Sequence, residues 1–295
     1  MNMQQTFDPR QGSSFEPSLP QRFPEHLVAL ADGAQLAVRE CGSGPVVVLL
    51  HGIGSGSASW LHCAQRLAAS CRVIAWDAPG YGQSTALAQA RPKASDYAAR
   101  LELLLQALDV QRCLLVGHSL GALIATAYAC GPGAARVARL LLVSPARGYG
   151  AAELRETGVR VRQQRLDNLE RLGIDGLASE RPARLLGPNP SEESLAWVRW
   201  NMARLNPQGY RQAVELLCAD DLLGYGVPSM PCEVHCGEAD AITSAEACGA
   251  IARRLGAPFS LIPGAGHASP IEQPDVVAGR IDHAQRQTIE GSAHG

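Results

Sequence analysis

Residues 112–130 read RCLLVGHSLGALIATAYAC, and this stretch decides the fold. Its first half is an apolar run typical of a buried strand, and its second half is a run of small apolar residues typical of a helix. Between them, Gly117 to Gly121 match the pattern G-x-S-x-G. Small flanking residues let the chain reverse sharply, so that the Ser119 hydroxyl stands above the sheet edge at a helix N-terminus. We predict that Ser119 is a nucleophile and that His118 packs within the turn.

Strand and helix patterns alternate on both sides of this turn, which predicts an α/β fold with a mostly parallel central sheet flanked by helices. Strands are expected at 26–31, 35–41, 45–50, 72–77, 112–118, 137–145, 231–240 and 258–264. Helices are expected at 57–69, 95–108, 120–130, 244–256 and from about 274 onward.

The alternation stops between residues 147 and 227, where no strand-like run occurs. Helical periodicity at 150–172, 177–186, 191–205 and 208–222 predicts a helical insertion between two halves of one sheet. Residues 1–22 are expected to be a flexible N-terminal arm and 289–295 a flexible tail. The core is expected to consist of two pieces, 23–146 and 228–288, with the helical insertion, 147–227, between them.

A serine nucleophile needs a base, and His267 is the candidate. It follows the last expected strand in a glycine-rich loop, 263–270, that can reach back to Ser119. Asp240 follows the preceding strand, so the residues occur in the chain order Ser, Asp, His that this geometry uses. Glu238 competes for the acid role, and we favour Asp240 because it lies further past the strand end.

Stabilising the negative charge on a reacting carbonyl oxygen requires two backbone donors. We expect one from the amide of Leu120, directly after the nucleophile, and the other from the amide of Ile53 in the loop after 45–50. The supporting loop and turn residues are expected to be His51, Gly52, Gly54, Gly117, His118 and Gly121.

Composition limits the classes of function. The chain has 295 residues, 46% of them hydrophobic, and a formal net charge of −2, which offers no basic surface for nucleic acid or anionic membranes. Nine cysteines without a framework spacing predict free, buried thiols. No apolar run is long enough to span a membrane and the N-terminus lacks a signal-peptide pattern, so the cytoplasm is expected. No metal-binding motif is present, and we expect neither metal nor cofactor.

The segments HGIGSGSASW (51–60), DAPGYGQST (77–85), GHSLGA (117–122), GEADAIT (237–243) and GAGHASPIEQPD (264–275), in this order, resemble the α/β-hydrolase family. The resemblance covers about residues 26–285 and is closest to members with a helical lid: esterases, lactonases and carbon–carbon bond hydrolases. It implies that 147–227 is a lid over the active site. Many carbon–carbon bond hydrolases of this type have Trp after the histidine, where this chain has Ala268, and Asn before the serine, where it has His118.

The leading hypothesis is a serine hydrolase that cleaves carboxylic esters of a small-molecule substrate. The alternatives are a carbon–carbon bond hydrolase or enol-lactonase with the same triad, and a non-catalytic binding protein. Trp197 and Trp200, three residues apart, are candidates for the substrate pocket, although core packing is the alternative that we favour. Carboxylate binding is a further option for some of the insertion's arginines, namely Arg160, Arg162, Arg199, Arg204 and Arg211. The oligomeric state stays open, with a homodimer as one alternative.

Overall fold

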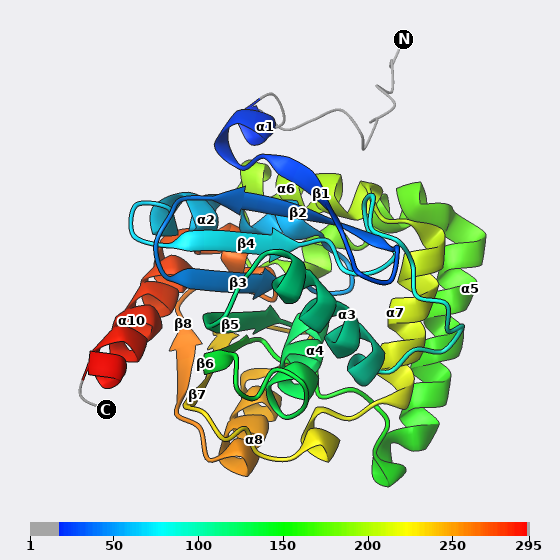
Figure 1. The fold of residues 1–295 in the computed structure, drawn as a ribbon. Coiled ribbons are helices and arrows are strands. Elements are labelled where there is room, and N and C mark those ends of the chain that lie inside the picture. Colours follow the sequence, from blue (N-terminus) through cyan, green and yellow to red (C-terminus); the bar gives the residue numbers. More distant parts are fainter. Residues whose placement is uncertain (1–17, 294–295) are drawn as a thin grey trace.

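A computed structural model describes residues 18–293 of the chain, and an eight-stranded sheet runs through these residues (Figure 1). The strands are Glu25–Ala29 (β1), Gln35–Cys41 (β2), Val46–Leu50 (β3), Arg72–Trp76 (β4), Cys113–His118 (β5), Val137–Val143 (β6), Cys232–Gly237 (β7) and Phe259–Ile262 (β8). Their spatial order is β1-β2-β4-β3-β5-β6-β7-β8; β2 pairs antiparallel with both β1 and β4, and all other neighbouring strands are parallel. The predicted α/β-hydrolase fold class is confirmed.

Strand β3 shows why the centre of the sheet reads as a continuous apolar run. Its side chains alternate between two separate core clusters, Val48 and Leu50 in one, Val47 and Leu49 in the other. All four are fully buried because successive strand residues point to opposite faces and both faces are covered.

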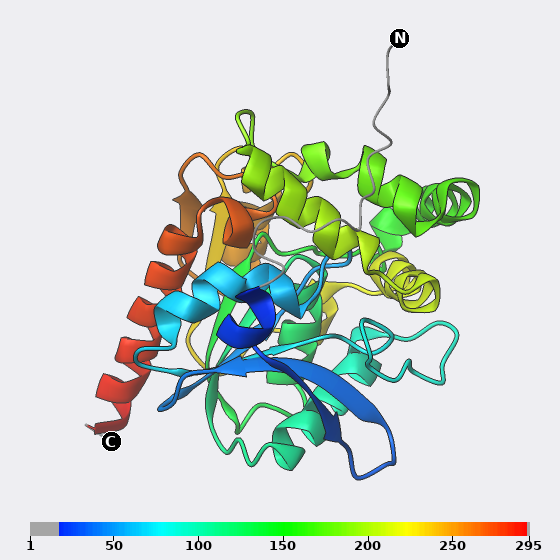
Figure 2. The ribbon, with the colours of Figure 1, turned by 90° about the horizontal axis from the view of Figure 1, so that it is seen from above.

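Helices of the core cover the two faces separately. Figure 2 shows helices α2 and α10 on one side of the sheet and α3 and α4 on the other. The core helices are Leu61–Leu67 (α2), Ala94–Ala107 (α3), Leu120–Ala129 (α4), Ala245–Leu255 (α8), Ser269–Glu272 (α9) and Pro274–Ala293 (α10), and 3₁₀ turn Ser57–Trp60 (η2) precedes α2. Since the central strands are parallel, their carboxyl ends share one edge, where the loops carrying Ser119, Asp240 and His267 emerge.

Between β6 and β7 the chain forms helices and no strand within the described residues. They are Ala152–Leu154 (η3), Arg155–Glu180 (α5), Pro182–Leu185 (η4), Glu192–Ala203 (α6), Pro207–Ala219 (α7) and Leu222–Tyr225 (η5). Helix α5 packs on both α6 and α7 at the edge of the molecule (Figures 1 and 2).

Helix α5 consists of two helical segments that meet at a kink, where the sequence predicted a break between helices at 150–172 and 177–186. A sharp kink occurs at Gly173, whose φ of 63° and ψ of −175° are non-helical, but the helix resumes at once and ends at Glu180. Glycine has no Cβ and adopts this backbone conformation without strain. The predicted break is therefore present, at Gly173, and the second segment begins a few residues earlier than expected.

The expected arm at 1–22 lies mostly outside the described residues. At the end of this arm, Leu19–Arg22 form a short helix, α1. Leu19 and Phe23 are buried in the core cluster that also contains Val47, Leu49 and residues of α2 and α10, here called the core cluster of α2 and α10. At the other end, α10 continues to Ala293, beyond the predicted start of the tail at 289. No helix of the described residues is long and apolar enough to cross a membrane.

Candidate active site

The turn between β5 and α4 holds Ser119 in a strained conformation. Its φ is 54° and its ψ is −115°, values that L residues rarely adopt, and its amide donates to Val143 O at 3.0 Å. A Cβ on Gly117 would lie 2.5 Å from Gly121 O, and a Cβ on Gly121 would lie 2.4 Å from Leu50 O. The two glycines are therefore required by the close approach of α4 to the strands.

Ser119, His267 and Asp240 meet at this turn, as the sequence predicted for their positions. The Ser119 hydroxyl donates to His267 Nε2 across 2.9 Å, and His267 Nδ1 donates to Asp240 Oδ2 across 2.8 Å. All three residues are buried. The carboxylate thus selects the imidazole tautomer whose free lone pair faces the serine, which is the arrangement that activates a hydroxyl nucleophile.

Hydrogen bonds from nitrogen and oxygen donors at four positions hold the Asp240 carboxylate as an anion, and the Cys236 thiol contacts it at 4.0 Å. Besides His267, the donors are the amides of Ile242 (2.8 Å) and Thr243 (2.9 Å) and the Thr243 hydroxyl (2.9 Å). Burial alone would raise the pKa of Asp240, but the hydrogen bond and charge of His267 and these amides together lower it well below its ordinary value. Sequence reasoning missed Thr243, although it ends the GEADAIT segment.

Glu238, the competing acid, lies away from His267. Its side chain is exposed, and its Oε2 accepts the amide of Gly264 at 2.9 Å. Of the two acids, only Asp240 contacts the imidazole within the described residues.

The two predicted backbone donors, Ile53 and Leu120, both border the cavity above Ser119. Neither amide donates to another described residue. The loop that carries Ile53 is fixed on both sides: the Tyr81 hydroxyl donates to Ile53 O at 2.9 Å, and His51 Nε2 accepts the amide of Ala78 at 3.0 Å. These contacts restrain the backbone of the loop that carries Ile53.

His118 holds the loop that carries His267 through a hydrogen bond to its backbone. Its Nε2 donates to His267 O at 2.7 Å, and the two rings are 5.0 Å apart. Burial, and next the charge of His267, lower the pKa of His118 to about 3, so this imidazole is neutral. The loop is also tied to the insertion, because Ala268 N donates to Leu185 O at 2.8 Å.

Comparison with known proteins identifies the family to which this arrangement belongs. A family model described as "Alpha/beta hydrolase family" matches residues 47–280. The chain belongs to the α/β-hydrolase family.

Relatives of this α/β hydrolase have several activities. An esterase from Thermogutta terrifontis, solved with malate bound, superposes with a TM-score of 0.78 at 26% identity over 90% of this chain and 98% of that one. A 2-hydroxy-6-oxononadienedioate/2-hydroxy-6-oxononatrienedioate hydrolase from Dechloromonas aromatica is 29% identical over 47% of this chain and 52% of its own. An uncharacterised Mycobacterium tuberculosis protein is 41% identical over 33% of this chain, and the match spans only 28% of that protein's length.

A cavity of about 700 Å³ opens above Ser119 in this hydrolase, between the core and the insertion. Core residues at its base include Ser119 and His267, and the insertion contributes Leu177, Met202 and Leu217. Such a volume suits a small-molecule substrate. Within the described part of the chain no cluster of three or more His, Cys, Asp or Glu side chains is arranged to hold a metal.

Trp197 and Trp200 do not border this cavity, so the structure supports core packing, the role that we favoured, over the pocket role that was the other candidate. Their rings stack 4.7 Å apart, and both residues are buried in the core cluster of α2 and α10. The opposite face of α6 lines the cavity through Val198, Met202 and Leu205, spaced four and then three residues apart. Periodicity indicates that the tryptophans share a face, but only packing decides which face meets the substrate.

We therefore expect Trp197→Ala to reduce stability rather than alter selectivity. Loss of a fully buried tryptophan should cost about 3–5 kcal/mol, whereas the exposed control Val159→Ala should change stability by less than about 0.5 kcal/mol. Thermal unfolding and the kcat/KM ratio between a short and a bulky ester measure the two effects. An unchanged melting temperature with a shifted ratio would restore Trp197 to the pocket.

The neutral His118 predicts a pH dependence of stability. An unfolded histidine binds a proton below pH about 6.5, whereas folded His118 does so only near pH 3, so its stabilising effect is present above 6.5 and lost as the pH falls. Between pH 7.5 and 5 the wild type should lose about 2 kcal/mol more unfolding free energy than His118→Asn. Urea denaturation at both pH values tests this, and equal losses in the two proteins would contradict it.

Proposed function

We propose that this α/β hydrolase is a serine esterase that cleaves carboxylic esters through an acyl-enzyme. The observation that carries the proposal is the continuous hydrogen-bond chain from Asp240 through His267 to Ser119 at the base of the cavity. A relay of this kind performs acyl transfer.

In the first step, Ser119 Oγ attacks the ester carbon as His267 Nε2 takes its proton. The negative charge then developing on the carbonyl oxygen is stabilised by the amides of Ile53 and Leu120. His267 gives the proton to the departing alcohol, and an acyl-serine remains. Water, deprotonated by His267, attacks the acyl carbon, and the proton returns to Ser119 as the acid leaves.

We further propose that residues 147–227 act as a lid. Their apolar side chains, such as Leu177, Met202 and Leu217, form part of the cavity wall and would exclude bulk water from the acyl-enzyme. The bond between Ala268 N and Leu185 O gives this lid a direct contact with the loop that carries His267.

A carbon–carbon bond hydrolase with the same triad is the second candidate. The relative from Dechloromonas aromatica favours it, since its name gives a 2-hydroxy-6-oxo dicarboxylate as the compound that it hydrolyses. An enol-lactonase remains part of this alternative, because ring opening of an enol-lactone uses the same attack by Ser119.

A substrate panel separates these candidates. It contains 4-nitrophenyl esters of acetic, butyric and octanoic acid, an enol-lactone and a 2-hydroxy-6-oxodienoate, all at one pH. We expect the highest kcat/KM on an ester. A higher kcat/KM on the oxodienoate or the lactone would assign the site to the second candidate.

A further inference from the structure

Arg165 and Arg181 both border the active-site cavity. Arg165 lies within the first half of the long helix α5, and Arg181 is the residue that caps its C-terminus. In a straight helix, residues 16 positions apart would lie about 24 Å from one another. The kink at Gly173 turns the second half of α5 back, and both side chains reach the same atom: Arg165 Nη1 donates to Tyr210 Oη at 3.3 Å, and Arg181 Nη1 at 3.0 Å.

No carboxylate pairs with either guanidinium in the described part of the chain. The cavity's two acidic residues, Glu153 and Asp221, are both bound to a third arginine, Arg147, at 2.8 and 3.0 Å. Burial, and next the charge of Arg165, lower the pKa of Arg181. Two like charges therefore share a partly desolvated corner of the cavity, an arrangement that an anion would stabilise.

Tyr210, on α7, completes this corner. Its oxygen accepts from both arginines, and its own hydrogen has no acceptor among the described residues. Its side chain is buried and borders the cavity. The cluster of Arg165, Arg181 and Tyr210, here called the donor cluster, thus presents hydrogen-bond donors alone, and a carboxylate supplies the matching acceptors.

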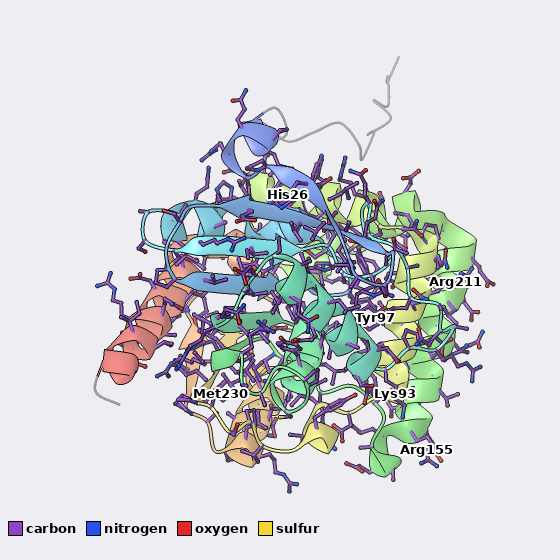
Figure 3. All side chains as sticks on the ribbon, in the orientation of Figure 1. His26, Lys93, Tyr97, Arg155, Arg211 and Met230 are labelled. Carbon is purple, nitrogen blue, oxygen red and sulfur yellow. The ribbon has the colours of Figure 1, made fainter. Side chains whose placement is uncertain are left out.

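The arginines singled out from the sequence do not form this corner. None of them borders the cavity above Ser119. Arg162 binds Glu215 through both of its Nε and Nη2 groups, Arg204 lies 4.5 Å over the Trp200 ring, and Arg211 pairs with Glu170 at 3.4 Å. Figure 3 shows Arg211 at the outer surface of the insertion.

We propose that the donor cluster is a binding subsite for a carboxylate on the substrate, so that the preferred esters carry a free carboxylate at the end remote from the scissile bond. The proposal rests on the proposed ester hydrolysis at Ser119. The wall of the same cavity also includes the apolar side chains of Leu177, Leu205 and Leu217, which suit a hydrocarbon spacer. The substrate class is therefore a half-ester of a dicarboxylic acid or a compound of the same pattern.

The test compares 4-nitrophenyl half-esters of dicarboxylic acids, from succinic to suberic, with neutral esters of equal chain length. We expect the wild type to prefer at least one half-ester over its neutral match. Arg181→Gln and Arg165→Gln should each lower kcat/KM for that half-ester about tenfold to a hundredfold, the usual effect of losing a charged hydrogen bond, and leave the neutral ester within about twofold. Arg181→Lys, which keeps the charge but not the planar fork, should lose less.

Arg160→Gln is the matched control, because Arg160 is an exposed arginine of the same helix that contacts Thr157 and does not border the cavity. It should leave both ester classes unchanged. If the Arg165 and Arg181 variants affect half-ester and neutral ester equally across the whole series, or affect neither, the carboxylate subsite is wrong while ester hydrolysis stands.

Binding without turnover separates the subsite from the reaction. Ser119→Ala is titrated calorimetrically with the free dicarboxylates of the same series, with and without Arg181→Gln. Binding that is lost with Arg181→Gln supports the subsite even if no ester is hydrolysed, in which case the proposed function alone fails. Equal binding by both proteins overturns the subsite.

Discussion

Ser119→Ala is expected to lower kcat by at least about three orders of magnitude on any substrate that the wild type hydrolyses. The hydroxyl is the atom that faces His267 Nε2 at 2.9 Å, and alanine leaves no group there to form the acyl-enzyme. Stability should change little or increase, because the strained φ of 54° stays while a buried polar group is removed.

Initial rates and thermal unfolding measure the two effects, with Ser95→Ala as the control. Ser95 is an exposed serine on α3, and its substitution should leave both quantities unchanged. A Ser119→Ala variant that is folded and retains a rate near that of the wild type would refute the mechanism.

Asp240→Asn carries the second large effect, a loss in kcat of the order of 10³ to 10⁴. The amides of Ile242 and Thr243 donate to Oδ1, so an asparagine would place its oxygen there and turn its NH₂ group toward His267. The imidazole would then have to accept at Nδ1 and hold its proton at Nε2, where it can no longer take the proton of Ser119. The fold need not change for the activity to be lost.

Glu238→Gln is the matched control for this substitution. Glu238 is exposed and accepts the amide of Gly264, so glutamine keeps an oxygen for that bond. Its kcat should stay within about threefold of the wild type, as expected for a surface change. A greater loss in Glu238→Gln than in Asp240→Asn would move the acid role to Glu238.

The core of the fold was predictable because its signals are local. The turn at Ser119 is encoded by glycines that stand where α4 meets the strands, and buried parallel strands such as β3 show an apolar run whatever their neighbours are. The order of the strands in the sheet depends on contacts between distant segments, and no local pattern indicated it.

Within the candidate site, the predicted positions of Ser119 and His267 follow from the same local logic. The choice between Asp240 and Glu238 could not be settled by spacing alone, because it depends on how the loop after β7 folds. The structure shows that the amides of Ile242 and Thr243 hold the Asp240 carboxylate toward His267.

The walls of the cavity were the least predictable part. Helical spacing showed that Trp197 and Trp200 lie on one face, but packing turned that face into the core. Arg165 and Arg181 come together only because of the kink at Gly173 and their shared contact with Tyr210 on another helix. Tertiary packing brings these residues together, and sequence periodicity does not predict it.

Covalent labelling is the most direct test of whether Ser119 is an activated nucleophile. The wild type is treated with a fluorophosphonate, and the adduct is located by intact-mass and peptide mass spectrometry. We expect one adduct per chain, on Ser119, that is absent from Ser119→Ala and much slower to form in Asp240→Asn. No adduct on the folded wild type, or an adduct on another residue that persists in Ser119→Ala, would contradict it.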